Sequence, residues 1–377
     1  MNTVPFASVS TSSSVTAQNK SRSFSADTCP VRVSIVSPTF GGYGGLEAFV
    51  LALLAGLPSD GQLEVRLFFK RVNGFNLQPE LSSAVAPLTD RIHFVERGSL
   101  DLFRAIKQSD VVHVQNPCPD VVAISRILNR RLLINVINHR QEGRAWRQRL
   151  WDASLRRAHR RFYISEFVRS TWEGPSPWPA STVIFPICRL AEGQLPADQR
   201  KGFVFVARWV PNKGIRTLIE AYRLANLDPV AWPLRLIGDG PLRIRIQEDL
   251  RTNPLPGVEL MGFLSEEQKT EMIRQSKWMV VPPQTNEDFG LTAIEARHLE
   301  VPCIVTRDGG VPEAAGDQAL VCEPGDASGL SRRLKEAAAM TSTEYSNRAK
   351  RTKETLLPLL TPPEHYGHVY RQMVSHR

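Results

Sequence analysis

The chain has 377 residues, more than one compact core usually holds, so its length indicates two domains. Hydrophobic residues make up 42% and charged residues 23% of it, a composition typical of globular rather than fibrous or disordered chains. A net charge of +9 favours acidic partners, but nucleotide phosphates, anionic lipid headgroups, acidic glycans and nucleic acid all meet that description.

The five cysteines are scattered and follow neither CxxC nor Cys/His ligand spacing. We therefore expect neither a disulfide framework nor a structural zinc. This cysteine pattern favours a reducing, cytoplasmic compartment. The longest apolar run, residues 48–57, is shorter than the roughly 20 residues that a membrane-spanning helix needs. Residues 1–28 are rich in Ser and Thr and are expected to be a disordered lead without a signal peptide.

In chain order, short apolar runs alternate with longer amphipathic segments from Val31 onward, which predicts parallel strands joined by helices. A polar segment without periodicity separates two such series, so we expect domains over residues 29–192 and 200–358, followed by a helix over 362–377. The expected strands are VRVSIVS, EVRLFFK, VVHVQ, LLINVI and RFYIS in the first domain and FVFVA, LRLIG, WMVVPP and CIVT in the second.

The first expected strand is followed by FGGYGGLEAF, with four glycines within five residues. Such glycines let backbone N–H groups approach a phosphate at a helix N-terminus. However, Glu47 stands where a dinucleotide fingerprint has its third glycine, and no Gly-Lys-Ser/Thr follows. The loop is therefore either a phosphate contact or a turn that needs glycine for its backbone alone.

The second domain offers two cations, Arg208 and Lys213, which flank a turn between FVFVA and the next helix. The planar arginine fork and the lysine point charge together would stabilise negative charge on a departing diphosphate. The alternative is a pair of solvated surface cations. At the next post-strand turn, which begins at Gly238, Asp239 is expected to cap a helix rather than bind a ligand.

Two glutamates bracket seven residues, with Glu287 in a post-strand loop and Glu295 in the following helix. The amides of Phe289, Gly290 and Leu291 would lie at the positive end of that helix and could bind phosphate or sugar oxygens. Glu295 is a candidate for a ribose diol and Glu287 for a sugar beyond the phosphates. The alternative is that Glu295 is an ordinary helix residue and Glu287 is a solvated charge in a loop.

Taken together, the ordered motifs resemble the retaining glycosyltransferases of family 4, formerly group 1. The resemblance covers nearly everything from Val31 onward and is carried by ARWVPNKG, LIGDGPL, GFLSEEQ, EDFGLTAIEA and GGVPEAAGD. It implies an α/β GT-B fold, in which two Rossmann-like domains face each other across a cleft, with an acceptor-side N-terminal domain and a nucleotide-sugar-binding C-terminal domain. It also implies that the last helix crosses back onto the first domain.

The resemblance assigns roles to individual residues. Glu287 would bind donor-sugar hydroxyls, Glu295 the ribose, and Arg208 and Lys213 the diphosphate, while His139, after LLINVI, would lie near the reacting sugar. The usual E-G-F-G is E-D-F-G here, which places Asp288 against the donor pocket. The expected catalytic residues are Glu287, His139, Arg208 and Lys213, and the expected donor-binding residues are Gly44, Gly45, Arg208, Lys213, Gly238, Phe263, Leu264, Asp288, Phe289, Gly290, Leu291 and Glu295.

The implied reaction moves a hexose-type sugar from a nucleoside diphosphate to a hydroxyl of a glycan or lipid-linked glycan, in the synthesis of cell-surface polysaccharide or glycoconjugate. No metal or other cofactor is expected, because cations and helix amides would stabilise the leaving group. Nucleotide-sugar epimerases and sugar phosphorylases share the fold and stay open as alternatives. An NAD-dependent oxidoreductase or a basic nucleic-acid-binding protein would leave the second-domain motifs unexplained, so nucleic acid is not an expected partner.

Residues 139–161 contain eight arginines around Trp146 and Trp151. A basic amphipathic helix there would lie on an anionic membrane, at its inner face, or bind an acidic glycan. The alternative is a helix that covers the domain and exposes a solvated basic face. The apolar residues expected to form one helical face are Trp146, Leu150, Leu155 and Ala158.

Overall fold

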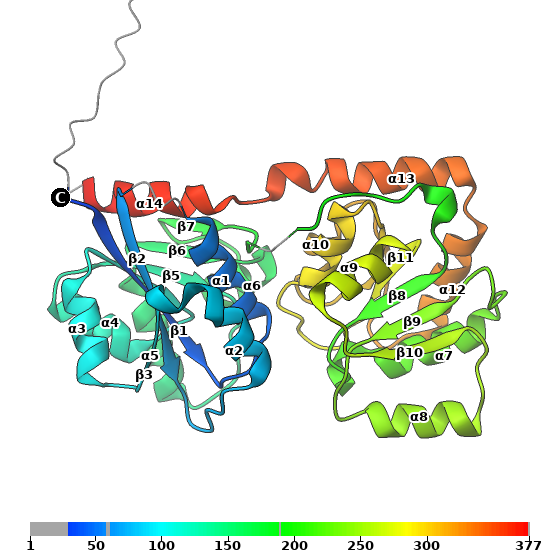
Figure 1. The fold of residues 1–377 in the computed structure, drawn as a ribbon, viewed down its shortest axis with the longest axis horizontal. Helices are drawn as coiled ribbons and strands as arrows, with labels where there is room; N and C mark the ends of the chain where they lie inside the picture. Colours follow the sequence, from blue (N-terminus) through cyan, green and yellow to red (C-terminus); the bar gives the residue numbers. More distant parts are fainter. Residues whose placement is uncertain (1–28, 58–60, 188–189, 376–377) are drawn as a thin grey trace, which may run out of the picture.

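A computed structural model describes residues 29–57, 61–187 and 190–375 of the chain (Figure 1). The expected lead over residues 1–28 and Cys188 lie outside these ranges. Within them the chain forms two α/β domains that stand side by side, each around its own parallel sheet. The expected fold class is confirmed.

The N-terminal domain contains a seven-stranded parallel sheet in the order β3-β2-β1-β4-β5-β6-β7. Alternate residues of β1 enter different hydrophobic clusters, Ile35 one and Val36 another, because helices cover both faces of the sheet. Its strands are β1 Val31–Thr39, β2 Leu63–Arg71, β3 Ile92–Val95, β4 Val111–Gln115, β5 Arg131–Val136, β6 Arg160–Tyr163 and β7 Ser181–Val183. Its helices are α1 Gly45–Gly56, α2 Pro79–Val85, α3 Leu100–Gln108, α4 Pro119–Ile127, α5 Ala145–Arg156 and α6 Glu166–Glu173.

The C-terminal domain contains a six-stranded parallel sheet in the order β10-β9-β8-β11-β12-β13. Its strands are β8 Phe203–Val206, β9 Leu234–Ile237, β10 Val258–Gly262, β11 Trp278–Val281, β12 Cys303–Thr306 and β13 Leu320–Cys322. Its helices are α7 Ile215–Ala225, α8 Arg243–Thr252, α9 Glu266–Arg274, α10 Leu291–His298, α11 Val311–Ala315, α12 Ala327–Ala339 and α13 Ser342–Glu354. Short 3-10 turns include η3, Pro211–Lys213.

The last helix, α14 (Pro363–Ser375), returns from the C-terminal domain and lies on the N-terminal domain (Figure 1). Tyr366, Val369, Tyr370 and Met373 belong to the same buried cluster as the core residues of α1 and β1. The helix therefore completes the hydrophobic core of the first domain with residues from the far end of the chain.

A buried polar pair fixes α14 to the sheet. His113, at the centre of the apolar strand β4, is fully buried, and its Nδ1 lies 2.7 Å from the hydroxyl of Tyr370. Burial lowers the pKa of His113 to about 3 from its ordinary value of 6.5. The ring is thus held neutral at physiological pH, which supports a structural role for it.

The neutral state of His113 predicts a pH dependence of stability. Between pH 6.5 and about 3 the unfolded chain binds a proton at this residue and the folded chain does not, so the free energy of unfolding should decrease as the pH falls through that window. The contribution is about 1.4 kcal/mol per pH unit at most. Urea unfolding from pH 7 to pH 4 should show a shallower decrease for His113→Gln than for the wild type. The exposed His368→Gln is the control, and equal slopes for His113→Gln and the wild type would contradict the assignment.

Candidate functional site

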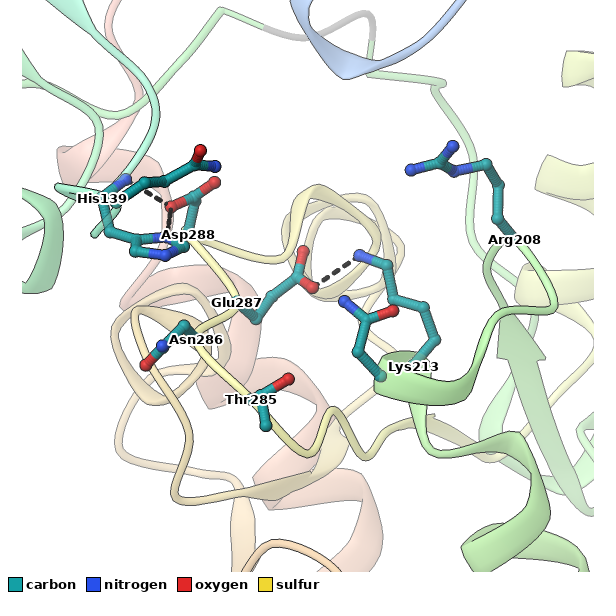
Figure 2. A pocket seen from close by; sticks show the side chains of 9 residues that line it. His139, Arg208, Lys213, Thr285, Asn286, Glu287 and Asp288 are labelled. Atoms are coloured by element: carbon teal, nitrogen blue, oxygen red, sulfur yellow. Dashed lines mark hydrogen bonds and ion pairs between the residues drawn. The ribbon is translucent and has the colours of Figure 1, made fainter. Parts of the chain in front are cut away.

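Loops that follow strands of both sheets enclose a cavity of about 450 Å³ between the domains (Figure 2). Because ligands of open parallel sheets bind at the carboxyl ends of the strands, the cavity lies where such a site is expected. It brings together five residues predicted from the sequence, His139, Arg208, Lys213, Glu287 and Asp288. It also includes four that were not predicted, Gln141, Asn212, Thr285 and Asn286.

The two cations of the cavity, Arg208 and Lys213, differ in whether they are ion-paired. Lys213 ends η3, and its Nζ lies 2.5 Å from Oε2 of Glu287. Arg208 follows β8 and is exposed, and no hydrogen bond or ion pair engages its guanidinium among the described residues. Figure 2 shows Arg208 at a distance from the Lys213–Glu287 pair. An anionic ligand could therefore bind Arg208 directly. It could bind Lys213 only by displacing the carboxylate of Glu287.

A second carboxylate holds the loop that carries Glu287. Oδ1 and Oδ2 of the buried Asp308 accept the backbone N–H groups of Asn286 and Glu287, at 2.9 and 2.8 Å. Gly309 has a φ of +54°, and a Cβ there would lie 2.0 Å from the carbonyl oxygen of Glu287, so the turn requires glycine. Asp308 was not predicted from the sequence, although its position just before the glycines of GGVPEAAGD is a signal that could have identified it.

The carboxylate of Asp288 faces the N-terminal domain (Figure 2). Its Oδ1 accepts from the backbone N–H of His139 at 2.6 Å and lies 2.7 Å from the ring Nδ1 of His139. Its Oδ2 accepts from Nδ2 of Asn138 at 2.9 Å. The residue that departs from the usual motif thus bridges the two domains at the wall of the cavity.

The amino end of α10 lies against the glycine loop of the first domain. A Cβ at Gly45 would be 3.0 Å from Cδ1 of Leu291, so the absence of a side chain permits this approach. Gly290 has a φ of +101° and precedes the helix. The Phe289 side chain is only 2% exposed and packs edge-on against Phe185 of the first domain, with ring centroids 4.8 Å apart. The ring of Phe289 is therefore part of the contact between the domains.

The amino end of α1 already carries a carboxylate. Oε1 of Glu47, in the first turn, accepts a 3.0 Å hydrogen bond from the Thr39 hydroxyl, which itself accepts from the N–H of Gly41. Burial raises the pKa of Glu47. A phosphate at this helix end would meet the Glu47 carboxylate, so the structure favours a close backbone approach of Gly44 and Gly45 over a phosphate cradle.

Besides Gly44, Gly45 and residues 289–291 described above, three predicted residues of the C-terminal domain lie outside the lining of the cavity. Gly238 has a φ of +125°, and a Cβ there would lie 1.9 Å from the carbonyl oxygen of Ala207, so the turn itself needs glycine. The Phe263 side chain is 72% exposed. Leu264 is partly buried against the core.

Glu295 also lies apart from the main cavity. It lines a separate, smaller hollow with residues of α9, and its Oε1 accepts from Nζ of Lys269 at 3.2 Å. Burial raises the pKa of Glu295, and the neighbouring Lys269 opposes this shift. Oε2 of Glu295 is buried 3.1 Å from Nζ of the same lysine, and it accepts no hydrogen bond among the described residues. A buried acceptor of this kind is suited to a hydroxyl donor.

A further carboxylate joins the domains behind the cavity. Oε1 and Oε2 of Glu313, in α11, accept the backbone N–H groups of Phe167 and Glu166, the first residues of α6. Ser165, which caps α6, also donates from its hydroxyl to the carbonyl oxygen of Asp288 at 2.8 Å. Burial raises the pKa of Glu313, while these backbone donors act in the opposite direction. The free N–H groups at the amino end of α6 thus find their acceptor in the other domain.

The expected apolar face of α5 is divided. Leu155 and Ala158 are buried, whereas Trp146 is 57% and Leu150 46% exposed. The prediction of one continuous face was therefore wrong, because the last turn of the helix packs into the domain core while the first turns project from it. Trp151 packs against Trp172, with ring centroids 6.2 Å apart.

No helix within the described ranges is long and apolar enough to cross a bilayer. In the same part of the chain, no group of three or more His, Cys, Asp or Glu side chains is arranged to hold a metal ion.

Comparison with known proteins gives a family match for the second domain. Residues 190–355 match the model of the glycosyl transferases group 1 family. An uncharacterized glycosyltransferase of Methanocaldococcus jannaschii is 32% identical over 135 residues, which cover 35% of this chain and 37% of that protein. The O-antigen chain mannosyltransferase B of Escherichia coli is 26% identical over 137 residues, 35% of either chain. The match thus spans little more than a third of each relative.

Comparison with solved structures identifies the fold over 92% of the chain. The structure of Anabaena HepE in complex with UDP superposes with a TM-score of 0.72 at 13% identity, covering 92% of this chain and 100% of that one. Sucrose-phosphate synthase from Thermosynechococcus elongatus superposes with a TM-score of 0.66 at 18% identity, again over 92% of this chain. The two Rossmann-like domains therefore have the GT-B arrangement.

The contact of Glu313 with α6 predicts that Glu313→Ala loosens the domain interface. Two backbone donors at a helix N-terminus would lose their acceptor, which costs about 1 kcal/mol when a helix cap is removed. Chemical denaturation should show the loss of stability, and small-angle X-ray scattering should show a larger radius of gyration. The exposed α12 residue Glu336, changed to Ala, should leave both unchanged. An unaltered scattering curve for Glu313→Ala would show that this contact does not hold the domains together.

Proposed function

We propose that this protein is a glycosyltransferase that moves a hexose-type sugar from a nucleoside-diphosphate donor to a hydroxyl of a glycan or lipid-linked glycan. The observation that carries the proposal is the interdomain cavity, in which two cations, the loop carboxylate Glu287 and the opposing His139 share one lining. The group 1 family match over residues 190–355 supports the same activity. Synthesis of cell-surface polysaccharide or glycoconjugate is the proposed context, because one relative is an O-antigen chain mannosyltransferase.

In the proposed reaction, Arg208 and Lys213 stabilise the negative charge that develops on the departing diphosphate. Lys213 can do so only after it exchanges the carboxylate of Glu287, 2.5 Å away, for phosphate oxygens. That exchange frees Glu287 to accept hydrogen bonds from hydroxyls of the donor sugar. Binding of the donor and release of Glu287 are therefore one event, and no metal is needed to neutralise the leaving group.

The rest of the donor is proposed to lie along the C-terminal domain. The amides at Phe289, Gly290 and Leu291 would bind oxygens at the positive end of α10. Glu295 would accept hydroxyls of the ribose in exchange for its ion pair with Lys269. The exposed ring of Phe263, with Leu264, would lie beside the base, next to the turn that contains Gly238.

The stereochemical outcome is proposed to be retention of the anomeric configuration. The resemblance to family 4 enzymes supports this, and the cavity itself is compatible with a route through either a front-face transfer or a covalent intermediate. Nucleotide-sugar epimerases and sugar phosphorylases differ from this proposal in their products. Release of nucleoside diphosphate that depends on an added acceptor hydroxyl would distinguish transfer from both.

The charge arrangement predicts a large effect of Arg208→Ala. Loss of one preorganised donor to a developing negative charge costs roughly 100- to 1,000-fold in kcat. Mass-resolved transfer assays with GDP-mannose, UDP-glucose, UDP-galactose and UDP-N-acetylhexosamines would measure it, with EDTA added in a parallel series that should change nothing. Arg216→Ala, on the exposed face of α7, is the matched control. Near-normal turnover by Arg208→Ala with an unaltered melting temperature would refute its role.

The acceptor side of the proposal includes peripheral contact with the inner face of an anionic membrane. Trp146 and Leu150 project from the first turns of α5, and exposed arginines flank them. Aromatic and aliphatic side chains beside cations are typical of helices that lie at a lipid surface. A helix placed there would hold a lipid-linked acceptor close to the cavity, which Gln141 lines just before α5.

Vesicle flotation tests this contact. Wild-type protein should float with vesicles that contain phosphatidylserine and not with neutral ones, and changing Arg144, Arg147 and Arg149 to Gln should weaken the binding by about 1 kcal/mol per charge. The corresponding change of Arg243, Arg245 and Arg251 on the exposed α8 keeps the net charge matched and should have little effect. Equal flotation of both triple variants would eliminate a specific role for α5.

A further inference from the structure

The residue that departs from the usual E-G-F-G motif is held by three donors of the opposite domain. Asp288 accepts from the N–H of His139, from Nδ2 of Asn138 and, at Oδ1, from the ring Nδ1 of His139. Its carboxylate is thus fully engaged with the N-terminal domain. A glycine at this position would leave all three donors without this partner.

The orientation of these donors is fixed within the N-terminal domain. Oδ1 of Asn116, which follows β4, accepts the backbone N–H groups of Ile137 and Asn138, at 2.9 and 3.2 Å. This fixes which end of the Asn116 amide is oxygen, so its Nδ2 donates to Oδ1 of Asn138 at 2.7 Å. The Asn138 amide must then direct its own Nδ2 at Asp288. The first domain therefore offers donors only, and an ionised carboxylate is the group that can accept them all.

The same contact decides which ring nitrogen of His139 carries the proton. An ionised carboxylate has no proton to give, so Nδ1 of His139 must be the donor of the 2.7 Å bond. The neutral ring then carries its lone pair on Nε2. Because His139 lines the cavity, Nε2 is the ring nitrogen left to accept a hydrogen bond from a hydroxyl there.

Asp288 and His139 belong to different domains, so the contact exists only when the domains meet. The carbonyl oxygen of Asp288 is held in the same way, by the hydroxyl of Ser165 in the first domain. The loop that carries Asp288 also carries Glu287, which is ion-paired with Lys213. The position of His139 is thereby tied to the loop that faces the donor.

We propose that Asp288 is a positioning residue: when the cleft closes, it holds His139 in the Nδ1–H tautomer and presents Nε2 to a hydroxyl in the cavity. This proposal rests on the proposed glycosyl transfer for its catalytic consequence, but the tautomer itself is a property of the protein. Closure of the domains and selection of the His139 tautomer then occur in a single step. The Asp in place of the usual Gly supplies a contact that a glycine cannot make.

The tautomer can be measured without any substrate. Long-range proton–nitrogen correlation spectra of the full chain, with the His139 signal identified by its loss in His139→Gln, should show a proton on Nδ1 of the neutral ring. Asp288→Ala should abolish this preference, because it removes the oxygen that accepts from both His139 donors, and Asp288→Glu should retain part of it. Asp249→Ala, an exposed change in α8 of the same domain as Asp288, should leave the spectrum unchanged. An unchanged His139 tautomer in Asp288→Ala would overturn the proposal.

Transfer assays test the consequence for turnover. Asp288→Ala should lower kcat by about 10- to 100-fold, the effect known for partners that orient metal-binding histidines, with the donor KM within about threefold of the wild type. Asn116→Ala should act in the same direction and more weakly. Equal kcat values for wild type and Asp288→Ala would also overturn the proposal. If wild-type protein transfers no sugar from any donor while its tautomer still depends on Asp288, the proposed function fails and the positioning role stands.

Discussion

The geometry of the cleft depends on two carboxylates of the C-terminal domain whose partners lie in the N-terminal domain. Glu313 accepts the first amides of α6, and Asp288 accepts the donors around His139. A carboxylate that loses contact with water needs hydrogen bonds in return, so each is stable in its present place only while the other domain supplies them. One hydrophobic cluster, which includes Phe289 and Ile164 from opposite domains, adds apolar burial around these contacts. The loops that line the cavity are thereby kept opposite one another.

The charged residues at the carboxyl ends of the C-terminal strands are mostly paired with one another. Lys213 is paired with Glu287 and Lys269 with Glu295, and Arg208 extends from β8 without such a partner among the described residues. For the proposed transfer reaction, these pairs keep carboxylates and cations satisfied until a donor arrives. A diphosphate and a diol then replace the internal partners, so that binding energy is used to rearrange the site as well as to hold the ligand.

The glycines of FGGYGGLEAF have a role that differs from a phosphate loop. Glu47 already occupies the amino end of α1, where an anion would otherwise sit, and the absence of a side chain at Gly45 lets the loop approach Leu291 across the cleft. At Gly45 the missing side chain therefore leaves room for the Leu291 side chain of the other domain. The glycine content of the motif alone could not distinguish this from anion binding, because both need backbone without side chains.

The sequence by itself determined the central strands, since strands buried on both faces leave continuous apolar runs. The sequence did not reveal four strands, β3, β7, β10 and β13. These are the edge strands of the two sheets, which have a neighbouring strand on one side only and therefore do not require a continuous apolar run. The motifs also identified most of the charged residues that line the cavity. Only the tertiary structure decided which residues touch, because His139 and Asp288 are 149 positions apart and no local pattern records a contact between domains. The same reason hid the contact of Glu313 with α6. Asp308 and Asn116 make their contacts within one domain, but with partners 22 and 21 positions away, so the pairing again depends on the fold.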